Sequence, residues 1–112
     1  MKKDPKFFLQ HILDSIAEIE KNLKGTSEAE FKKSVPKQDA VIRRLGIIGE
    51  AAKNIPGGIR LQYKFVPWKK IAGARDVLIH NYFEVDLKTV WNAATKDIIQ
   101  LKQDVREILR EM

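Results

Sequence analysis

Apolar residues recur at alternating steps of three and four along most of this chain, and no other feature constrains its fold as strongly. In the last 26 residues the steps run 4, 3, 4, 3, 4, 3, 4. The residues of this stripe are Leu87, Trp91, Ala94, Ile98, Leu101, Val105, Ile108 and Met112. Such a stripe covers one side of an α-helix and packs as in a coiled coil or a helix bundle. We therefore expect one long helix from Leu87 to Met112, with Asp86 as its N-cap.

Two earlier tracts show the same spacing. The first follows Asp4 and Pro5, an N-cap and a proline at the first helical position, and ends at Gly25. The second begins at Pro36 and stops at the sequence Asn54-Ile55-Pro56-Gly57-Gly58. The two stripes are Leu9, Ile12, Ile16, Ile19 and Leu23, and then Val41, Leu45, Ile48, Ala52 and Ile55. Each tract predicts a long amphipathic helix.

Shorter elements complete the expected fold. Ser27 and Glu30 have the spacing of a capping box, which predicts a brief helical turn before Pro36. A loop of about ten residues follows the second long helix, and a shorter third helix begins at Trp68 and ends near Asn81. A strand is conceivable only at residues 61–66. We predict an all-α fold: a single domain over residues 1–112, built as an up-and-down four-helix bundle with an additional short helical turn.

Composition removes several classes of protein. The 112 residues include no cysteine, which excludes disulfide scaffolds, thiol catalysis and cysteine-based zinc or iron–sulfur sites. The longest apolar runs are a few residues, and the first eight residues, MKKDPKFF, lack the apolar block of a secretion signal. A cytoplasmic location without a membrane span is therefore expected.

The positive charge is concentrated in one segment. The chain carries a net charge of +6, and residues 51–75 hold six basic side chains and no acidic one. The six are Lys53, Arg60, Lys64, Lys69, Lys70 and Arg75. Aromatic residues lie between them at positions 63, 65 and 68, an interleaving that suits RNA binding by backbone contacts and base stacking. Alternatively, Trp68 and Phe65 are core residues and the lysines keep a loop soluble. We predict RNA contacts by Arg60, Lys64, Lys69 and Lys70.

An arginine interrupts the apolar stripe of the third helix. Trp68, Ile71 and Leu78 step by three and then seven, and Arg75 fills the missing position. An unpaired buried guanidinium is costly, so Arg75 should have an anionic partner or face a groove or subunit interface. The simplest partner is Glu50 on the second long helix, in a structural ion pair.

A histidine near this arginine indicates chemistry. His80 lies four residues after Asp76, so the two stack one helical turn apart. The carboxylate can hold the imidazole in one tautomer and favour its protonated form, as a general acid or base requires. A histidine and an arginine without cysteine suit phosphoryl chemistry, in which the imidazole moves protons and the guanidinium neutralises phosphate oxygens. The other histidine, His11, lies on the polar side of the first helix with Asp14, Ser15 and Glu18, and is most simply a solvated surface residue.

The segment Arg75-Asp76-Val77-Leu78-Ile79-His80-Asn81-Tyr82 matches an Arg-x4-His-x-Tyr motif. With residues 47–52, Val85-Asp86 and Val90-Trp91, it resembles the HepT-like toxins, which are HEPN-domain proteins encoded with minimal nucleotidyltransferases (MNT). The resemblance covers nearly the whole chain. It implies a homodimeric helical bundle that places two copies of Arg75 and His80 in a composite cleft and cleaves RNA without a metal or other cofactor. It also implies an MNT antitoxin, which in some systems adds AMP to the motif tyrosine, here Tyr82.

A dimer also follows from the chemistry. Cleavage of RNA through its own 2′-OH needs one group to accept a proton and another to donate one. Each chain offers one suitable histidine, so pairing two His80 side chains across a two-fold axis supplies both roles. In this interpretation Arg75 stabilises the transition state, Asp76, Asn81 and Glu50 are supporting residues, and Tyr82 contacts substrate and is the modification site.

Two alternatives remain open. The chain could be a non-catalytic partner of a nucleotidyltransferase, binding a nucleotide in the same cleft or presenting Tyr82 as a substrate. A metal site formed by Asp76, His80 and Glu84 is weaker, because ligands at i, i+4 and i+8 on one helix diverge too far to chelate an ion.

Overall fold

The computed structural model describes residues 4–80 and 86–112, and the side chains of residues 4–74 and 86–112. These residues form helices and connecting turns, and the predicted all-α bundle is confirmed. In chain order the elements are α1 (Pro5–Leu23), α2 (Glu28–Lys33), α3 (Val35–Lys53), α4 (Gly57–Gln62), α5 (Trp68–His80), α6 (Leu87–Asn92), the π-helical segment η2 (Ala93–Asp97) and α7 (Ile98–Glu111).

Local signals in the sequence set the helix starts. The Asp4 carboxylate accepts a hydrogen bond from the backbone N–H of Lys6 at 2.8 Å, and Pro5 opens α1. The predicted capping box is present at α2, where Ser27 and Glu30 satisfy each other's backbone N–H groups. Gly25 has a φ of 72°, which lets the chain turn sharply between the two helices.

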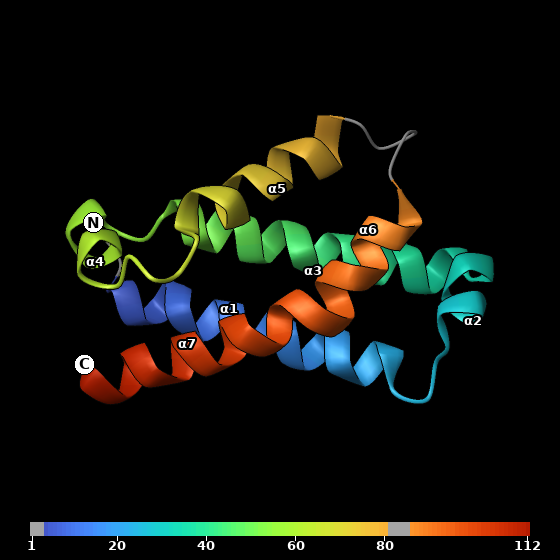
Figure 1. Cartoon of the computed structure of the whole chain (residues 1–112), viewed down its shortest axis with the longest axis horizontal. Coiled ribbons are helices and arrows are strands. Elements are labelled where there is room, and N and C mark those ends of the chain that lie inside the picture. The colour runs from blue at the N-terminus through green and yellow to red at the C-terminus, as the bar shows by residue number, and fades with distance from the viewer. Residues whose placement is uncertain (1–3, 81–85) are drawn as a thin grey trace.

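Helix α3 is the centre of the bundle (Figure 1). It packs against α1 on one side and α5 on the other, while α7 packs along α1. The fully buried side chains come mainly from the predicted stripes, among them Ile12, Ile16, Val41, Val105 and Ile108. Burial of each such aliphatic side chain stabilises the fold by about 1.5–3 kcal/mol, and this core fixes the face on which α5 lies.

The expected loop before Pro67 is partly helical, so that prediction was wrong. The carbonyl of Pro56 accepts hydrogen bonds from Ile59 and Arg60, both at 3.1 Å, and starts the one-and-a-half-turn helix α4. Proline is pre-organised for a helix start, and the buried residues on either side of α4, Ile55 and Tyr63, hold it against the bundle. Residues 61–66 form the end of α4 and a turn, not a strand.

The prediction of one uninterrupted helix at the end of the chain was also wrong. Residues 93–97 form a π-helical turn, which accommodates one extra residue between α6 and α7. The buried stripe therefore starts at Val90 and takes two successive steps of four, to Ala94 and Ile98, before the 3, 4 alternation resumes at Leu101. Trp91, expected in the stripe, is only partly buried and lies against Phe31 of α2, with ring centroids 5.5 Å apart. Met112 is 40% exposed.

Candidate active site and nucleic-acid interface

The Arg-x4-His motif lies in the C-terminal half of α5. Arg75 is the eighth of the 13 residues of the helix and His80 is the last. Five residues at 1.5 Å each separate them by about 7.5 Å along the helix axis, and Asp76 lies one turn before His80. The backbone of α5 thus carries Arg75, Asp76 and His80 on one helix. The side chains of these three residues, and the predicted site residues Asn81 and Tyr82, lie outside the described residues.

A firm N-cap starts the helix that follows the motif. The Asp86 carboxylate accepts hydrogen bonds from the backbone N–H of Lys88 at 2.9 Å and from the Thr89 hydroxyl at 3.0 Å. These bonds, led by the one from Lys88, lower the pKa of Asp86. The Lys88 ammonium also pairs with Glu28 of α2 at 2.9 Å and lowers the pKa of that carboxyl. The start of α6 is therefore tied to α2.

Glu50, the predicted partner of Arg75, lies on α3, the helix against which α5 packs. Its side chain is exposed to solvent in the single chain. Buried neighbours on α3, Gly49, Ala51 and Ala52, fix this part of the helix within the bundle. An ion pair between Glu50 and Arg75 stays a prediction, because the Arg75 side chain lies outside the described residues.

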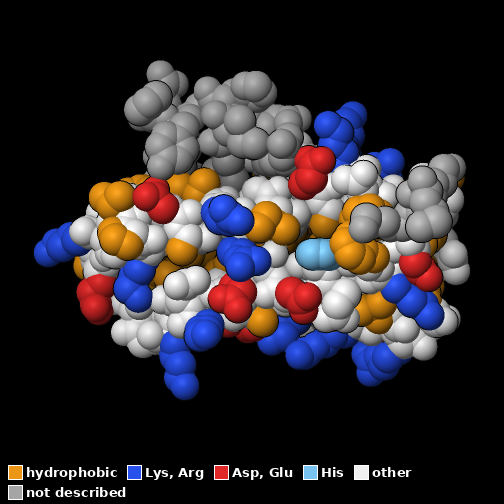
Figure 2. Space-filling view, turned by 180° about the vertical axis from the view of Figure 1, so that it is seen from behind, with side chains coloured by type: hydrophobic (Ala, Val, Ile, Leu, Met, Phe, Trp, Pro, Cys, Tyr) orange, Lys and Arg blue, Asp and Glu red, His pale blue; other side chains and the backbone are white. Residues whose placement is uncertain are grey.

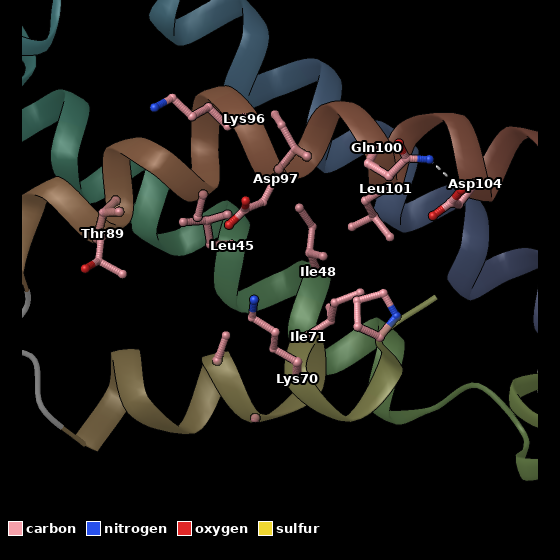
Figure 3. A pocket seen from close by; sticks show the side chains of 16 residues that line it. Leu45, Ile48, Lys70, Ile71, Thr89, Lys96, Asp97, Gln100, Leu101 and Asp104 are labelled. Carbon is pink, nitrogen blue, oxygen red and sulfur yellow. Dashed lines mark hydrogen bonds between the residues drawn. The ribbon is translucent and has the colours of Figure 1, made fainter. Parts of the chain in front are cut away.

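A groove of about 780 Å³ runs between α5 and the α6–η2–α7 segment, with α3 as its floor. Figure 3 shows Leu45, Ile48 and Ile71 on the floor and the α5 side. The spacing of apolar residues in the sequence did not predict this groove. Val90 lines the groove and Trp91 does not. The sequence could have indicated this only if the extra residue of the π-helical turn had been recognised, because that residue decides which of the two belongs to the last stripe.

Charges of both signs surround the groove. Figure 3 shows Lys70 of α5 and Asp97 of η2 pointing into it from opposite sides, while Lys96 points away. Asp104 accepts a hydrogen bond from the Gln100 amide at 2.9 Å. Because two carboxylates balance the two lysines, the groove does not concentrate positive charge for a polyanion.

The four predicted RNA-binding residues lie toward the start of α5. Arg60 is half-buried on α4, whereas Lys64, Lys69 and Lys70 are exposed. The first residue of α5 and His80 are 12 residues apart, or about 18 Å along the helix, so these basic residues and His80 lie toward opposite ends of α5 (Figure 1). On the face opposite to that of Figure 1, basic and acidic side chains are interspersed (Figure 2).

The structure separates the three aromatic residues of the basic segment. Tyr63 and Trp68 are core residues, with 6% and 5% of their surfaces exposed, whereas Phe65 is 60% exposed. The Trp68 indole donates a hydrogen bond to the Tyr63 carbonyl at 3.0 Å. The core interpretation is therefore right for Trp68 and wrong for Phe65, and Tyr63 is a further core residue.

The surface role predicted for His11 is confirmed. His11 is exposed, and its ring lies 4.4 Å from that of Phe7, centroid to centroid. Ser15, expected on the same polar side, is only 1% exposed, so that placement was wrong. Its hydroxyl is buried without a hydrogen bond in the described part of the chain, because the residue borders the stripe of Ile12, Ile16 and Ile19.

Residues 4–74 and 86–112, whose side chains are described, contain no group of three or more His, Asp or Glu placed to hold a metal ion. The weaker alternative of Asp76, His80 and Glu84 involves side chains outside these ranges and stays a prediction. Among the described helices, none is both long and apolar enough to cross a membrane.

The helical bundle and the motif on α5 define a HEPN-like class of protein, and comparisons with known proteins identify the family. A family model described as ribonuclease HepT-like matches residues 12–108. The chain belongs to this family, which confirms the resemblance seen in the sequence and the enzyme class, a ribonuclease. No solved structure matches the chain.

Individual relatives agree with this family. The chain is 42% identical over 109 residues to a protein of Caldanaerobacter subterraneus subsp. tengcongensis provisionally named as an RNase, covering 97% of each chain. It is 40% identical over 102 residues to a probable ribonuclease HepT of Thermococcus cleftensis, covering 91% of this chain and 93% of that one. A Methanocaldococcus jannaschii protein, 48% identical over 112 residues, carries the names of a gamma-glutamylcyclotransferase and an RNase. The chain spans half the length of that relative.

Proposed function

We propose that this protein is the endoribonuclease toxin of a HEPN/MNT toxin–antitoxin pair and acts as a homodimer in the cytoplasm. The observation that supports this most directly is the Arg75-x4-His80 spacing on α5 in a chain of the HepT-like family. A nucleotidyltransferase antitoxin neutralises it by adding AMP to Tyr82.

The cleavage is metal-independent and uses the 2′-OH of the RNA as nucleophile. One His80 accepts the 2′-OH proton as that oxygen attacks phosphorus. The His80 of the second protomer donates a proton to the leaving 5′-oxygen. The Arg75 guanidinium stabilises the negative charge that develops on the phosphate oxygens, and Asp76, Asn81 and Glu50 orient these groups.

The basic side chains toward the start of α5 hold the RNA backbone. Lys64, Lys69 and Lys70 are exposed, and Arg60 is half-buried beside them in the chain. Contacts to phosphates bind without reading sequence and weaken as salt rises. These residues therefore contribute affinity and leave target choice to the cleft.

The test is RNA cleavage by purified, unmodified protein carrying His80→Ala, with His11→Ala as the matched control. General acid–base catalysis contributes about 10²–10⁴-fold, so His80→Ala should lower the cleavage rate by at least about 100-fold. His11→Ala should cleave like the wild type, since His11 is a surface residue on α1. Cleavage by His80→Ala at the wild-type rate would contradict the proposal.

Two further measurements test its remaining parts. Wild-type cleavage activity should persist in the presence of a metal chelator. Loss of that activity would favour the alternative of a metal site. Incubation with ATP and the nucleotidyltransferase should add AMP mass to the wild type and not to Tyr82→Phe. An unmodified wild-type dimer with no cleavage activity would instead make the chain a non-catalytic partner of the nucleotidyltransferase.

A further inference from the structure

We infer that Phe65, at the tip of the turn between α4 and α5, stacks on an unpaired base of single-stranded RNA. The inference rests on the proposed function for its substrate class, and adds a contact about the length of α5 away from His80. Phe65 is an aromatic side chain with 60% of its surface exposed, although Tyr63 and Trp68 on either side of it are buried.

The turn that carries Phe65 is held rigidly. The Tyr63 carbonyl accepts two hydrogen bonds, from the backbone N–H of Val66 at 3.1 Å and from the Trp68 indole at 3.0 Å. The backbone N–H groups of Tyr63 and Trp68 are also bonded, to Ile59 and Val66 at 3.0 and 2.8 Å. Since residues 63, 66 and 68 are buried, the turn presents only Lys64, Phe65 and Pro67 to solvent.

The Phe65 ring itself is positioned by a buried neighbour. It lies edge-to-face against Tyr63, with centroids 6.1 Å apart and planes at 86°. At its other end the Tyr63 hydroxyl faces Glu111 at the end of α7, and hydrogen bonding to that carboxyl raises the pKa of the hydroxyl. A ring fixed in this way loses little entropy when a base stacks on it.

The charge around Phe65 favours a nucleic acid over a protein partner. The described residues 51–74 include five basic side chains and no acidic one, and the two that lie nearest Phe65 on either side in the sequence, Lys64 and Lys69, are both exposed. Stacking on an exposed aromatic ring, combined with phosphate contacts from nearby lysines, is how proteins bind single strands without sequence preference. A base inside a duplex has no free face for such a contact.

The experiment measures binding of a labelled, unstructured RNA of about ten nucleotides to the full chain carrying His80→Ala, so that no cleavage occurs. Phe65→Ala should raise the Kd about tenfold, the effect of losing one stacked base, and Phe65→Trp should restore binding. Binding to a blunt RNA duplex should be unchanged. The matched control is Leu61→Ala, which removes another exposed apolar side chain, 75% exposed on α4, and should leave the Kd within about twofold.

Several results would overturn the inference. Unchanged single-strand binding by Phe65→Ala would do so, as would equal losses for single strand and duplex. Wild-type binding by Phe65→Leu would show an apolar contact without stacking. Loss of nucleotidyltransferase binding by Phe65→Ala, with RNA binding intact, would make the turn a protein interface. Because these measurements need no cleavage, a wild type that binds through Phe65 but does not cut RNA would refute the proposed function alone.

Discussion

Trp68→Phe tests whether the buried indole hydrogen bond stabilises the turn before α5. The Trp68 side chain is 5% exposed, and its N–H donates to the Tyr63 carbonyl at 3.0 Å. Phenylalanine keeps the ring packing but removes this donor, which costs about 1 kcal/mol. The Tyr63 carbonyl keeps its bond from the Val66 N–H, so no acceptor is left wholly unpaired. The smaller ring costs about another 1 kcal/mol in lost contacts.

The expected total is about 2 kcal/mol of unfolding free energy, or a fall in Tm of about 8 °C for a chain of this size. Urea unfolding followed by far-UV circular dichroism measures this loss of stability. The urea concentration at the unfolding midpoint should fall, while the dependence of the unfolding free energy on urea concentration should stay the same. The wild type and the variant should be compared at the same protein concentration, because a dimer is also stabilised by mass action.

Trp91→Phe is the matched control for this variant. Trp91 is partly buried against Phe31, and its indole makes no hydrogen bond to the described part of the chain. The same change of ring there should cost about 1 kcal/mol or less. Each variant also leaves one tryptophan as a fluorescence reporter. If Trp68→Phe is no more destabilising than Trp91→Phe, the hydrogen bond to Tyr63 does not stabilise the turn and the reasoning is refuted.

Two further predictions concern the segment after the motif. The pKa values of Asp86 and Glu28 are lowered by Lys88, so the stability they contribute is present above their ordinary pKa values of 3.8 and 4.5 and is lost as the pH falls through the lowered values of the folded state. Urea unfolding should show that Lys88→Met, which removes the ion pair with Glu28 but keeps the backbone N–H bonded to Asp86, destabilises the protein at neutral pH and has no effect at a pH where the Glu28 carboxyl is protonated; an equal effect at both pH values contradicts this. Deletion of Lys96 should convert the π-helical turn into ordinary α-helix and preserve a cooperative thermal transition, because the turn holds one extra residue. Deletion of Gln103 within α7 should be far more damaging, since it rotates the helix that follows by about 100°; equal stability of the two deletions would show that the π-helical turn has no spare residue.

The sequence predicted the long helices because each has a stripe whose burial decides its orientation. Ile12 and Ile16 of α1, and Val41 of α3, lie where the spacing placed them. The spacing failed at residues 93–97, because a π-helical turn changes the stripe by a single residue. A step of four residues between buried positions occurs in both α-helical and π-helical turns, so the spacing alone does not decide whether Val90 or Trp91 is buried. That choice depends on contacts of α6 with α2 and α3.

For the candidate site, the sequence identified the motif but not its surroundings. The spacing of Arg75 and His80 follows directly from the helix that contains them. The exposure of Phe65 does not, because Tyr63, Phe65 and Trp68 are all aromatic and lie in one short basic segment. Which of them enters the core depends on the hydrogen bonds to the Tyr63 carbonyl and on the position of Glu111, about 50 residues away in the sequence.

The first helix begins, and the last helix ends, at the same end of the bundle as the turn that carries Phe65 (Figure 1). Glu111, the last residue of α7, lies close enough to the Tyr63 hydroxyl to raise its pKa. Polypeptide fused to the end of α7 would therefore emerge beside Phe65 and the lysines, on the side away from His80. A purification tag placed there would shield the surface on which RNA binding is to be measured, and it should be removed before such measurements are made.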